Sequence, residues 1–409
     1  MVEKNNCKFI GLCDSEKCSG CSACFNVCPT NSILMQENQY AEIHPIVNYD
    51  TCLNCGLCRK VCPQISGINF KECCKCYAGW RSDENKRKNS SSGGIAALIY
   101  EKFFKLGYTC YGVKYDFKTG ALFLPVKSIK DIDQMKGSKY VQANVGKIFS
   151  DIGNKLENNE KIVFIGSPCQ IAGIENFINV KYKKFRENII LIDFLCHGTV
   201  PGKYLLDEIH EIECNKKTHA NGISFRSNIS KRNYYFSLYD NYHLFYSKKA
   251  ELQPYFYGFL NSTFCRDSCI DCPYKYEKRV GDVTLGDFIG LGYSIPITIP
   301  QGINPSLILI NSKQGEKVIK EIQNESVLIE RNFEEALLGG PSFHRKNVNN
   351  NKREKFRELY INSGYNKARN KVISKKMVIE YYTSKFYMLK RRIKNKIFKI
   401  LRENHEKID

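Results

Sequence analysis

The sequence has no uninterrupted apolar run that approaches the roughly 20 residues needed to span a bilayer. Its first residues, MVEKNNCKFIGLCDSEKC, contain no apolar segment of the kind that a secretory signal requires. These absences exclude a membrane-spanning protein and favour a cytoplasmic one. The length of 409 residues is enough for two or three domains, each with an apolar core.

The charge is strongly basic, but its distribution argues against nucleic-acid binding. The chain has 62 Lys and Arg against 42 Asp and Glu, a formal net charge of +20. Residues 351–409 contain 18 of these basic residues and 6 of the acidic ones, a net charge of +12. More than half of the excess therefore belongs to a C-terminal tail. Because the rest of the chain is only mildly basic, we expect no nucleic-acid partner.

Cysteine, in contrast, is abundant, with 20 residues in the chain. In a protein without a secretory signal, this abundance indicates metal or redox chemistry in a reducing compartment. CSGCSACFNVCP (residues 18–29) and CLNCGLCRKVCP (residues 52–63) share the spacing C-x2-C-x2-C-x3-C-P. This is the pattern of a bacterial ferredoxin with two [4Fe–4S] clusters, in which the fourth cysteine of each run binds the other cluster. The predicted ligands are Cys18, Cys21, Cys24 and Cys62 for the first cluster, and Cys52, Cys55, Cys58 and Cys28 for the second.

A pair of zinc sites is the alternative for these cysteines. Zinc ribbons use two pairs of cysteines, however, and not two triplets that are each followed by Cys-Pro. We therefore predict that residues 1–70 form a small α+β ferredoxin domain, with short strands and a loop between the two runs. The crowded Cys73, Cys74 and Cys76 that follow supply no complete ligand set and are interpreted as spare thiols.

Residues 95–106 have the apolar periodicity of a helix, and Gly107 is suited to end it. Its start, Ser90-Ser91-Ser92-Gly93-Gly94, combines small residues with free backbone N–H groups that suit an anion such as a nucleotide phosphate. An ordinary serine cap is the alternative, and the residues alone favour it.

From residue 161 onward, strands and helices alternate. KIVFIG and NIILIDFL are predicted buried strands, followed by the turns GSPCQ and CHGTV and then by helices. Cys169 and Cys196 thus each follow the carboxyl end of a strand, the edge at which open α/β sheets bind ligands. The fold class predicted is α/β, a mixed sheet with flanking helices, preceded by the ferredoxin domain.

A third group of cysteines, Cys265, Cys269 and Cys272, lies in CRDSCIDCPYKY. Its C-x3-C-x2-C spacing also occurs in radical enzymes that bind S-adenosylmethionine, but there it stands in the first loop of a repeated βα barrel. A closed cluster that combines Cys269 and Cys272 with Cys169 and Cys196 is simpler, with Cys265 as a competitor for one position. Structural zinc and unrelated buried thiols remain the alternatives.

Several stretches together resemble one family, the beta subunits of coenzyme F-420 hydrogenases and dehydrogenases, in the form fused to an N-terminal ferredoxin. They occur in family order over roughly residues 74–315. The stretches are SSSGGIAALI, GSKYVQANVG, IVFIGSPCQIAGI, IDFLCHGTVPG, CRDSCIDCPYKYEKRVGDVTLGDFIG and PSLILINS.

The resemblance implies a domain over residues 71–345 that binds FAD and a third [4Fe–4S] cluster. It implies that Cys169, Cys196, Cys269 and Cys272 are the ligands of this cluster. His197 is a candidate proton donor, with a structural role as the alternative. The family usually has an aromatic residue after the phenylalanine of its GDF segment, where this chain has Ile289. Residues implied in or near the flavin site are Ser92, Gly93, Gly94, Ser138, Lys139 and Tyr140.

These features predict an oxidoreductase that moves electrons between ferredoxin-type clusters and a flavin, for two-electron chemistry on a small-molecule substrate. An external ferredoxin or redox enzyme would be its electron partner. The alternative is an electron-transfer subunit of a larger hydrogenase or dehydrogenase complex without a substrate of its own. The sequence does not select the substrate, the direction of electron flow, FAD over FMN, or whether the chain forms a homo-oligomer.

Residues 346–409 are predicted to form a basic helical tail. SKFYMLKRRIKNKIFKILREN places apolar residues three or four apart, with Lys and Arg opposite. Such a helix can lie on an anionic membrane surface as a peripheral contact. Docking on the protein itself or on a second subunit is the alternative, and we favour it because globular helices show the same stripe.

Overall fold

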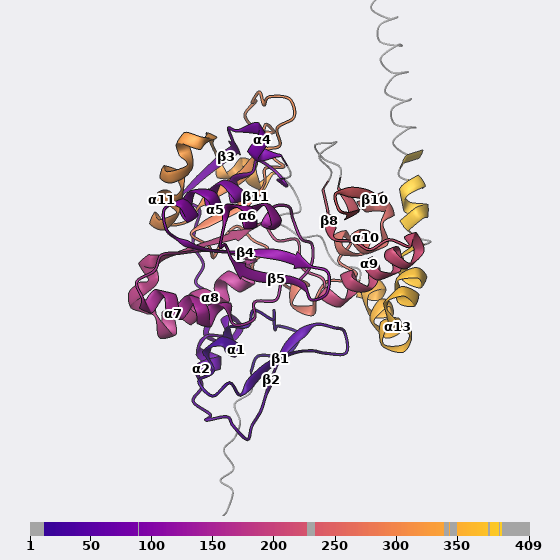
Figure 1. Ribbon diagram of the computed structural model, residues 1–409, viewed down its shortest axis with the longest axis horizontal. Coiled ribbons are helices and arrows are strands. Elements are labelled where there is room, and N and C mark those ends of the chain that lie inside the picture. Colours follow the sequence, from indigo (N-terminus) through magenta and orange to yellow (C-terminus); the bar gives the residue numbers. More distant parts are fainter. Residues whose placement is uncertain are drawn as a thin grey trace, which may run out of the picture.

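The computed structural model describes residues 12–88, 90–226, 234–338, 343, 350–374, 377–383 and 385–386. A large mixed sheet forms the centre of the molecule, with helices on both faces (Figure 1). The cysteine-rich N-terminal part lies at one side of this central layer, and a group of helices with a small sheet lies at another. The described helices include none that is both long and apolar enough to cross a membrane.

The N-terminal part contains a two-stranded antiparallel sheet and short helices that follow the cysteine runs. It matches the predicted arrangement of short strands around a loop between the two runs. The elements are α1 (Ala23–Val27), β1 (Ile33–Glu37), β2 (Ile43–Val47), α2 (Leu57–Lys60) and α3 (Pro63–Ser66).

The central sheet has eight strands in the order β13-β3-β12-β11-β7-β6-β4-β5. Its middle strands β4, β6, β7 and β11 are parallel neighbours, and the strands toward both edges pair antiparallel. The strands are β3 (Lys75–Arg81), β4 (Thr109–Asp116), β5 (Gly120–Pro125), β6 (Ile162–Ile165), β7 (Ile189–Phe194), β11 (Val283–Asp287), β12 (Ser306–Ile310) and β13 (Ser326–Arg331).

The central strands are apolar on both faces because both faces are covered by helices. Ile162 and Phe164 of β6 pack toward α7 (Ile148–Glu157) and α8 (Pro168–Lys181). Val163, between them, packs on the opposite face, toward α5 (Ile95–Lys105) and α11 (Lys313–Ile322). The remaining short helical elements around the sheet are α4 (Glu84–Arg87), α6 (Ile129–Met135), η1 (Lys183–Asn188), η4 (Gln323–Glu325) and α12 (Phe333–Leu337).

A second hydrophobic core lies beside the sheet. It is built from α9 and α10, which pack against a three-stranded antiparallel sheet of order β10-β9-β8 and against α13. Phe356 and Tyr365 of α13 are buried in this core, so the region predicted as a tail begins with residues that pack inside the protein. The elements are α9 (Gly202–Lys216), β8 (Gly222–Ser224), β9 (Tyr235–Asp240), β10 (His243–Lys249), η2 (Ala250–Leu252), α10 (Pro254–Leu260), η3 (Asp267–Cys269), α13 (Asn350–Arg369) and η5 (Asn370–Ser374).

The fold class predicted from the sequence is confirmed, an α/β domain with a mixed sheet preceded by a ferredoxin-type part. The serine cap of α5 is a wrong prediction, because the residue before the helix is Gly94 in a left-handed conformation without a side-chain cap. Cys169 lies in the first turn of α8 and not in a turn before it. Most of the amphipathic segment SKFYMLKRRIKNKIFKILREN, for which docking was favoured over membrane contact, lies outside the described residues.

Candidate functional site

The predicted ligands of the first cluster converge in space although Cys62 comes from a distant part of the sequence. All four line one small cavity beside α1, and a further cysteine, Cys13, lines it too. Sequence reasoning missed Cys13, since it stands outside the repeated spacing. The cysteines that line the cavity are Cys13, Cys18, Cys21, Cys24 and Cys62.

The protonation of these thiols is set by their surroundings. Hydrogen bonding with Cys13 lowers the pKa of Cys18 and Cys62, which favours the thiolate form that binds iron. Burial raises the pKa of Cys21 to about 12 and raises that of Cys24 as well, so deprotonation of these two thiols has to be coupled to metal binding. The donor set therefore consists of partly buried thiols alone, and cysteine thiolates are the usual ligands of [4Fe–4S] clusters.

The second set is more exposed. Cys58 has Cys52 and Cys55 as electrostatic neighbours, so the second triplet is gathered in one place. Cys28 approaches them through a chain of hydroxyl groups: its thiol bonds Thr30, Thr30 bonds Ser32, and Thr51, next to Cys52, donates to Ser32 at 2.9 Å. Burial acts to raise the pKa of Cys28, but the hydrogen bonds with Thr30 and Ser32 outweigh it, so the pKa of this thiol is lowered.

No three His, Cys, Asp or Glu side chains within the described ranges stand close enough together to hold a single metal ion. In a [4Fe–4S] cube each cysteine binds a different iron. Ligands of a cluster therefore stand further apart than those of one ion.

Cys169 and Cys272, predicted for the third cluster, both pack against the hydrophobic cluster of α7 and α8. Cys196 follows β7 and Cys269 ends η3; both are partly buried, and their role as ligands stays a prediction. Cys265, the competitor, is buried near Tyr255, which belongs to the other hydrophobic core.

The first cysteine set (the predicted ligands of the first cluster) and the third cysteine set (the predicted ligands of the third cluster) meet at Cys21 and Cys169. Cys169 acts electrostatically on Cys21, and Gly173 of α8 lies so close to Cys21 that a Cβ there would stand 2.9 Å from its Sγ atom. Asn26 of α1 makes a further contact with the start of α7, donating to the carbonyl of Gly146 at 2.8 Å and accepting from the backbone N–H of Ser150 at 3.0 Å. The ferredoxin-type part is thus packed with its first cysteine set against the third.

The serines before α5 form hydrogen bonds that connect three segments. Ser92 bonds Ser306 of β12 at 2.9 Å, and the same Ser306 hydroxyl accepts from the Gly93 N–H at 3.0 Å. Ser138 donates to Ser91 at 2.8 Å. The structure therefore brings together Ser92, Gly93 and Ser138, while Gly94 supplies the left-handed turn (φ +80°) into α5.

Arg226, which the sequence analysis missed, lies at the centre of this region. It donates to the Ser91 carbonyl at 2.7 Å, to the Tyr140 hydroxyl at 2.8 and 3.0 Å, and pairs with Asp287 at 2.9 Å. The ring of Tyr234 lies under its guanidinium at 4.8 Å. Burial raises the pKa of Tyr140 although Arg226 opposes the shift, so this hydroxyl stays protonated. Asp287 lies at the carboxyl end of β11, on the edge predicted for ligand binding.

Two other predicted residues have structural contacts. The Lys139 ammonium donates to the Met135 and Lys136 carbonyls at the end of α6, at 2.7 and 3.0 Å. Burial lowers its pKa to about 7, while these carbonyls favour the charged form. The His197 ring packs edge-on against Phe259, with Nε2 3.5 Å from the Leu260 carbonyl oxygen.

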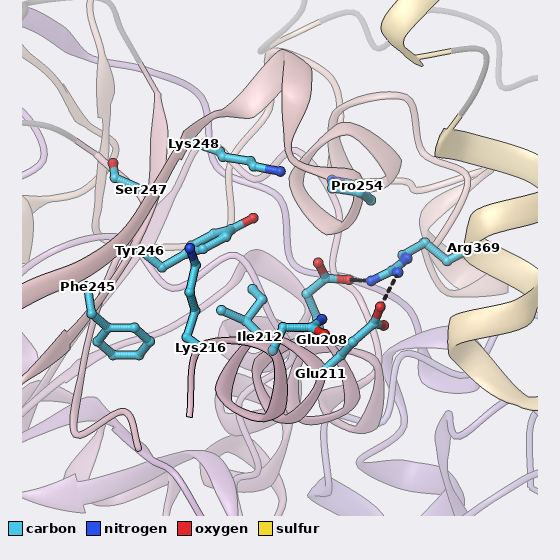
Figure 2. Close-up of a pocket in the computed structure, with 11 residues that line it drawn as sticks. Glu208, Glu211, Ile212, Lys216, Phe245, Tyr246, Ser247, Lys248, Pro254 and Arg369 are labelled. Atoms are coloured by element: carbon cyan, nitrogen blue, oxygen red, sulfur yellow. Dashed lines mark hydrogen bonds and ion pairs between the residues drawn. The ribbon is translucent and has the colours of Figure 1, made fainter. Parts of the chain in front are cut away.

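A separate pocket of about 460 Å³ opens between α9, β10 and α13 (Figure 2). Arg369 crosses one side of it and pairs with Glu208 at 2.6 Å and Glu211 at 2.9 Å. The amine of Lys216 and the ring of Tyr246 line it as well. None of the residues predicted for clusters or flavin lines this pocket, so it is distinct from the site above.

Comparisons with known proteins give two matches to family models. Residues 159–336 match the model that describes the C terminus of the coenzyme F420 hydrogenase/dehydrogenase beta subunit. Residues 17–65 match a 4Fe-4S dicluster domain. No curated protein matches the chain. Among solved structures, a chain of the xenon-derivatized F420-reducing [NiFe] hydrogenase complex from Methanosarcina barkeri is 14% identical, with a TM-score of 0.46, covering 70% of this chain and 93% of its own.

Proposed function

Because residues 159–336 match the C-terminal model of the coenzyme F420 hydrogenase/dehydrogenase beta subunit and residues 17–65 match a 4Fe-4S dicluster domain, we propose that the chain is an iron–sulfur flavoprotein oxidoreductase. It would hold two [4Fe–4S] clusters in the N-terminal part, a third on Cys169, Cys196, Cys269 and Cys272, and FAD beside them. A small-molecule substrate and an external ferredoxin or redox enzyme would be its reaction partners.

The observation that carries this proposal is the proximity of Cys21 and Cys169. These residues belong to two different predicted ligand sets, and the packing of α1 on α8 holds them as neighbours. When bound, the clusters supply one-electron transfer and the flavin couples it to two-electron chemistry.

The residues present fit a flavin at the carboxyl edge of the sheet. Arg226 supplies a partly buried guanidinium that pairs with Asp287 and bonds Ser91 and Tyr140. The Ser138 hydroxyl bonds Ser91 as well, and Ser92 and the Gly93 N–H follow Ser91 in the chain, so hydrogen-bonding groups of several segments gather here. Lys139 would act by fixing the end of α6 beside Ser138, and His197 would be a proton donor at the neighbouring edge.

Anaerobic reconstitution followed by quantification of iron, sulfide and flavin tests the proposal. We expect about twelve irons per chain, four for each of three clusters, and one flavin. Arg226→Met should lower flavin content without lowering iron, whereas the exposed Lys118→Met should leave both unchanged. A content of about eight irons would contradict the third cluster, and a preparation with full iron content but no flavin would contradict the assignment as a flavoprotein.

The second candidate, a subunit that transfers electrons without a substrate of its own, is favoured by the family description as a beta subunit. Purification of the native protein under anaerobic conditions separates the two. Stable association with a hydrogenase or dehydrogenase subunit supports the second candidate. A preparation without partners that oxidises reduced ferredoxin only when a small-molecule acceptor is present supports the first.

A further inference from the structure

Tyr274 is enclosed between the first and third cysteine sets. Its side chain is 6% exposed and belongs to the hydrophobic cluster of α7 and α8, against which Cys21, Cys169 and Cys272 also pack. Its ring lies 6.1 Å from that of Phe70, at the end of the N-terminal part. Arg279, itself buried, donates to the Tyr274 carbonyl at 3.0 Å and so fixes the backbone at this point.

The hydroxyl of this buried tyrosine finds no hydrogen-bond partner in the described part of the chain. Burying a hydroxyl without a partner costs free energy, and native proteins rarely do so. The groups that surround it electrostatically are Cys169, Cys21, Cys272 and Cys62, two from each predicted ligand set. An acceptor that completes this site would therefore have to lie among sulfur atoms.

We propose that Tyr274 donates a hydrogen bond to a sulfur atom of the third cluster, on the side that faces the first. This inference rests on the proposed function, because it requires the third cluster. Tyr274 would be a positioning residue, and its hydrogen bond would stabilise the more negatively charged reduced form. Hydrogen bonds to cluster sulfurs are among the factors that set the reduction potentials of iron–sulfur clusters.

The neighbouring Tyr276 provides a matched control. It lies two residues further along the same loop, but its side chain is 51% exposed, and it is not part of the hydrophobic cluster. Tyr274→Phe and Tyr276→Phe each remove one oxygen atom and keep the ring. They differ only in whether that oxygen faces the cysteines or water.

The experiment is a redox titration of the anaerobically reconstituted protein, monitored by electron paramagnetic resonance. The signal of the third cluster is assigned as the one that Cys169→Ser removes. At a fixed ambient potential, Tyr274→Phe should lower the ratio of reduced to oxidised third cluster about tenfold, since one hydrogen bond to a charged acceptor has roughly that effect on an equilibrium. The midpoints of the two ferredoxin clusters should not move, and Tyr276→Phe should leave all three unchanged.

An unchanged midpoint in Tyr274→Phe, at full iron content, would overturn the inference while leaving the proposed function intact. Eight irons in the wild-type protein would overturn both. Thermal denaturation of the cluster-free protein distinguishes a structural role of the hydroxyl from a hydrogen bond to the cluster. Without the cluster the hydroxyl has no acceptor, so Tyr274→Phe should be as stable as wild type or more so. A cluster-free variant that is less stable than wild type would assign the hydroxyl to packing and contradict the inference.

Discussion

Arg266 donates a hydrogen bond to the backbone carbonyl of Cys18 at 3.0 Å, joining the third cysteine group to the first cysteine run. The same guanidinium donates to the Ile43 carbonyl at 3.0 Å and to Gln142 at 2.6 Å, and it is fully buried. One side chain thus fixes the ferredoxin-type part against the large domain at the level of the proposed clusters.

Arg266→Met is expected to lower the free energy of unfolding by roughly 3 kcal/mol or more, because each buried acceptor left without a donor costs about 1–3 kcal/mol. Urea denaturation under anaerobic conditions measures this change. Arg266→Lys keeps the charge but lacks the planar guanidinium with its paired donors, so its stability should lie between those of wild type and Arg266→Met. A value for Arg266→Met within about 0.5 kcal/mol of wild type, the range of ordinary surface substitutions, would contradict this role.

Cys62→Ser should reduce the iron content from about twelve to about eight, because one cluster loses a ligand. Iron and sulfide analysis after reconstitution gives the number directly. Cys214→Ser is the control, since Cys214 is exposed on α9 and does not line the cavity of Cys18, Cys21, Cys24 and Cys62. Cys13→Ser tests the ligand assignment: it should retain about twelve irons, and a loss of four would make Cys13 a ligand.

Gly173→Ala tests the contact between α8 and the first cysteine set. In most helices this change is stabilising by about 1 kcal/mol. Here the new Cβ would lie 2.9 Å from Cys21 Sγ, so Cys21 has to shift away from the cavity. We expect lower iron incorporation, measured by reconstitution, despite the higher helix propensity. Gly202→Ala, in α9 with open space around it, should incorporate iron like wild type.

The ion pairs of Asp282 with Lys71 and Arg186 predict that the stability of the protein depends on pH. Burial opposes ionisation, but Lys71 and Arg186 more than compensate and lower the pKa of its carboxyl group below the usual value near 3.8. A lowered folded-state pKa means that the stabilisation is complete above about pH 4 and is lost as the pH falls through the folded-state pKa.

Asp282→Asn should therefore lose about 3–5 kcal/mol of stability at neutral pH, as expected when one partner of a buried ion pair is removed. The loss should shrink as the pH falls below about 4, where the carboxyl group of the unfolded chain becomes protonated, and should disappear once the pH falls below the lowered pKa of the folded protein. Acid-unfolding curves measure both effects. Asp271→Asn, whose exposed carboxylate pairs with Lys275, should follow the wild-type curve; equal losses in the two variants would refute the assignment.

Local patterns in the sequence were sufficient for the cysteine runs and for the central strands. Periodic spacing placed Cys18, Cys21 and Cys24 together, and continuous apolar stretches identified β6 and β7, because both signals are carried by neighbouring residues. The serine and glycine pattern at residues 90–94 indicated an anion site only as the less favoured interpretation, and the resemblance to a known family implied the flavin site near Ser92.

Residues that act over long separations could not be predicted in this way. Arg226 meets Ser91 across 135 positions, and Arg266 meets Cys18 across 248. An arginine in a loop has no spacing that distinguishes a buried guanidinium from a solvated one. Residues 346–409 were likewise predicted to be a basic tail because of their charge, and this prediction did not identify Phe356 and Tyr365 as core residues.

The anchoring of α13 also has a consequence for biosynthesis. Arg357 of α13 pairs with the buried carboxylate of Glu42, a residue 315 positions earlier in the chain. During translation the N-terminal part leaves the ribosome long before its partner arginine exists, so this ion pair cannot form until α13 has been made. The ferredoxin-type part therefore reaches its final packing against the rest of the protein only after synthesis of this helix.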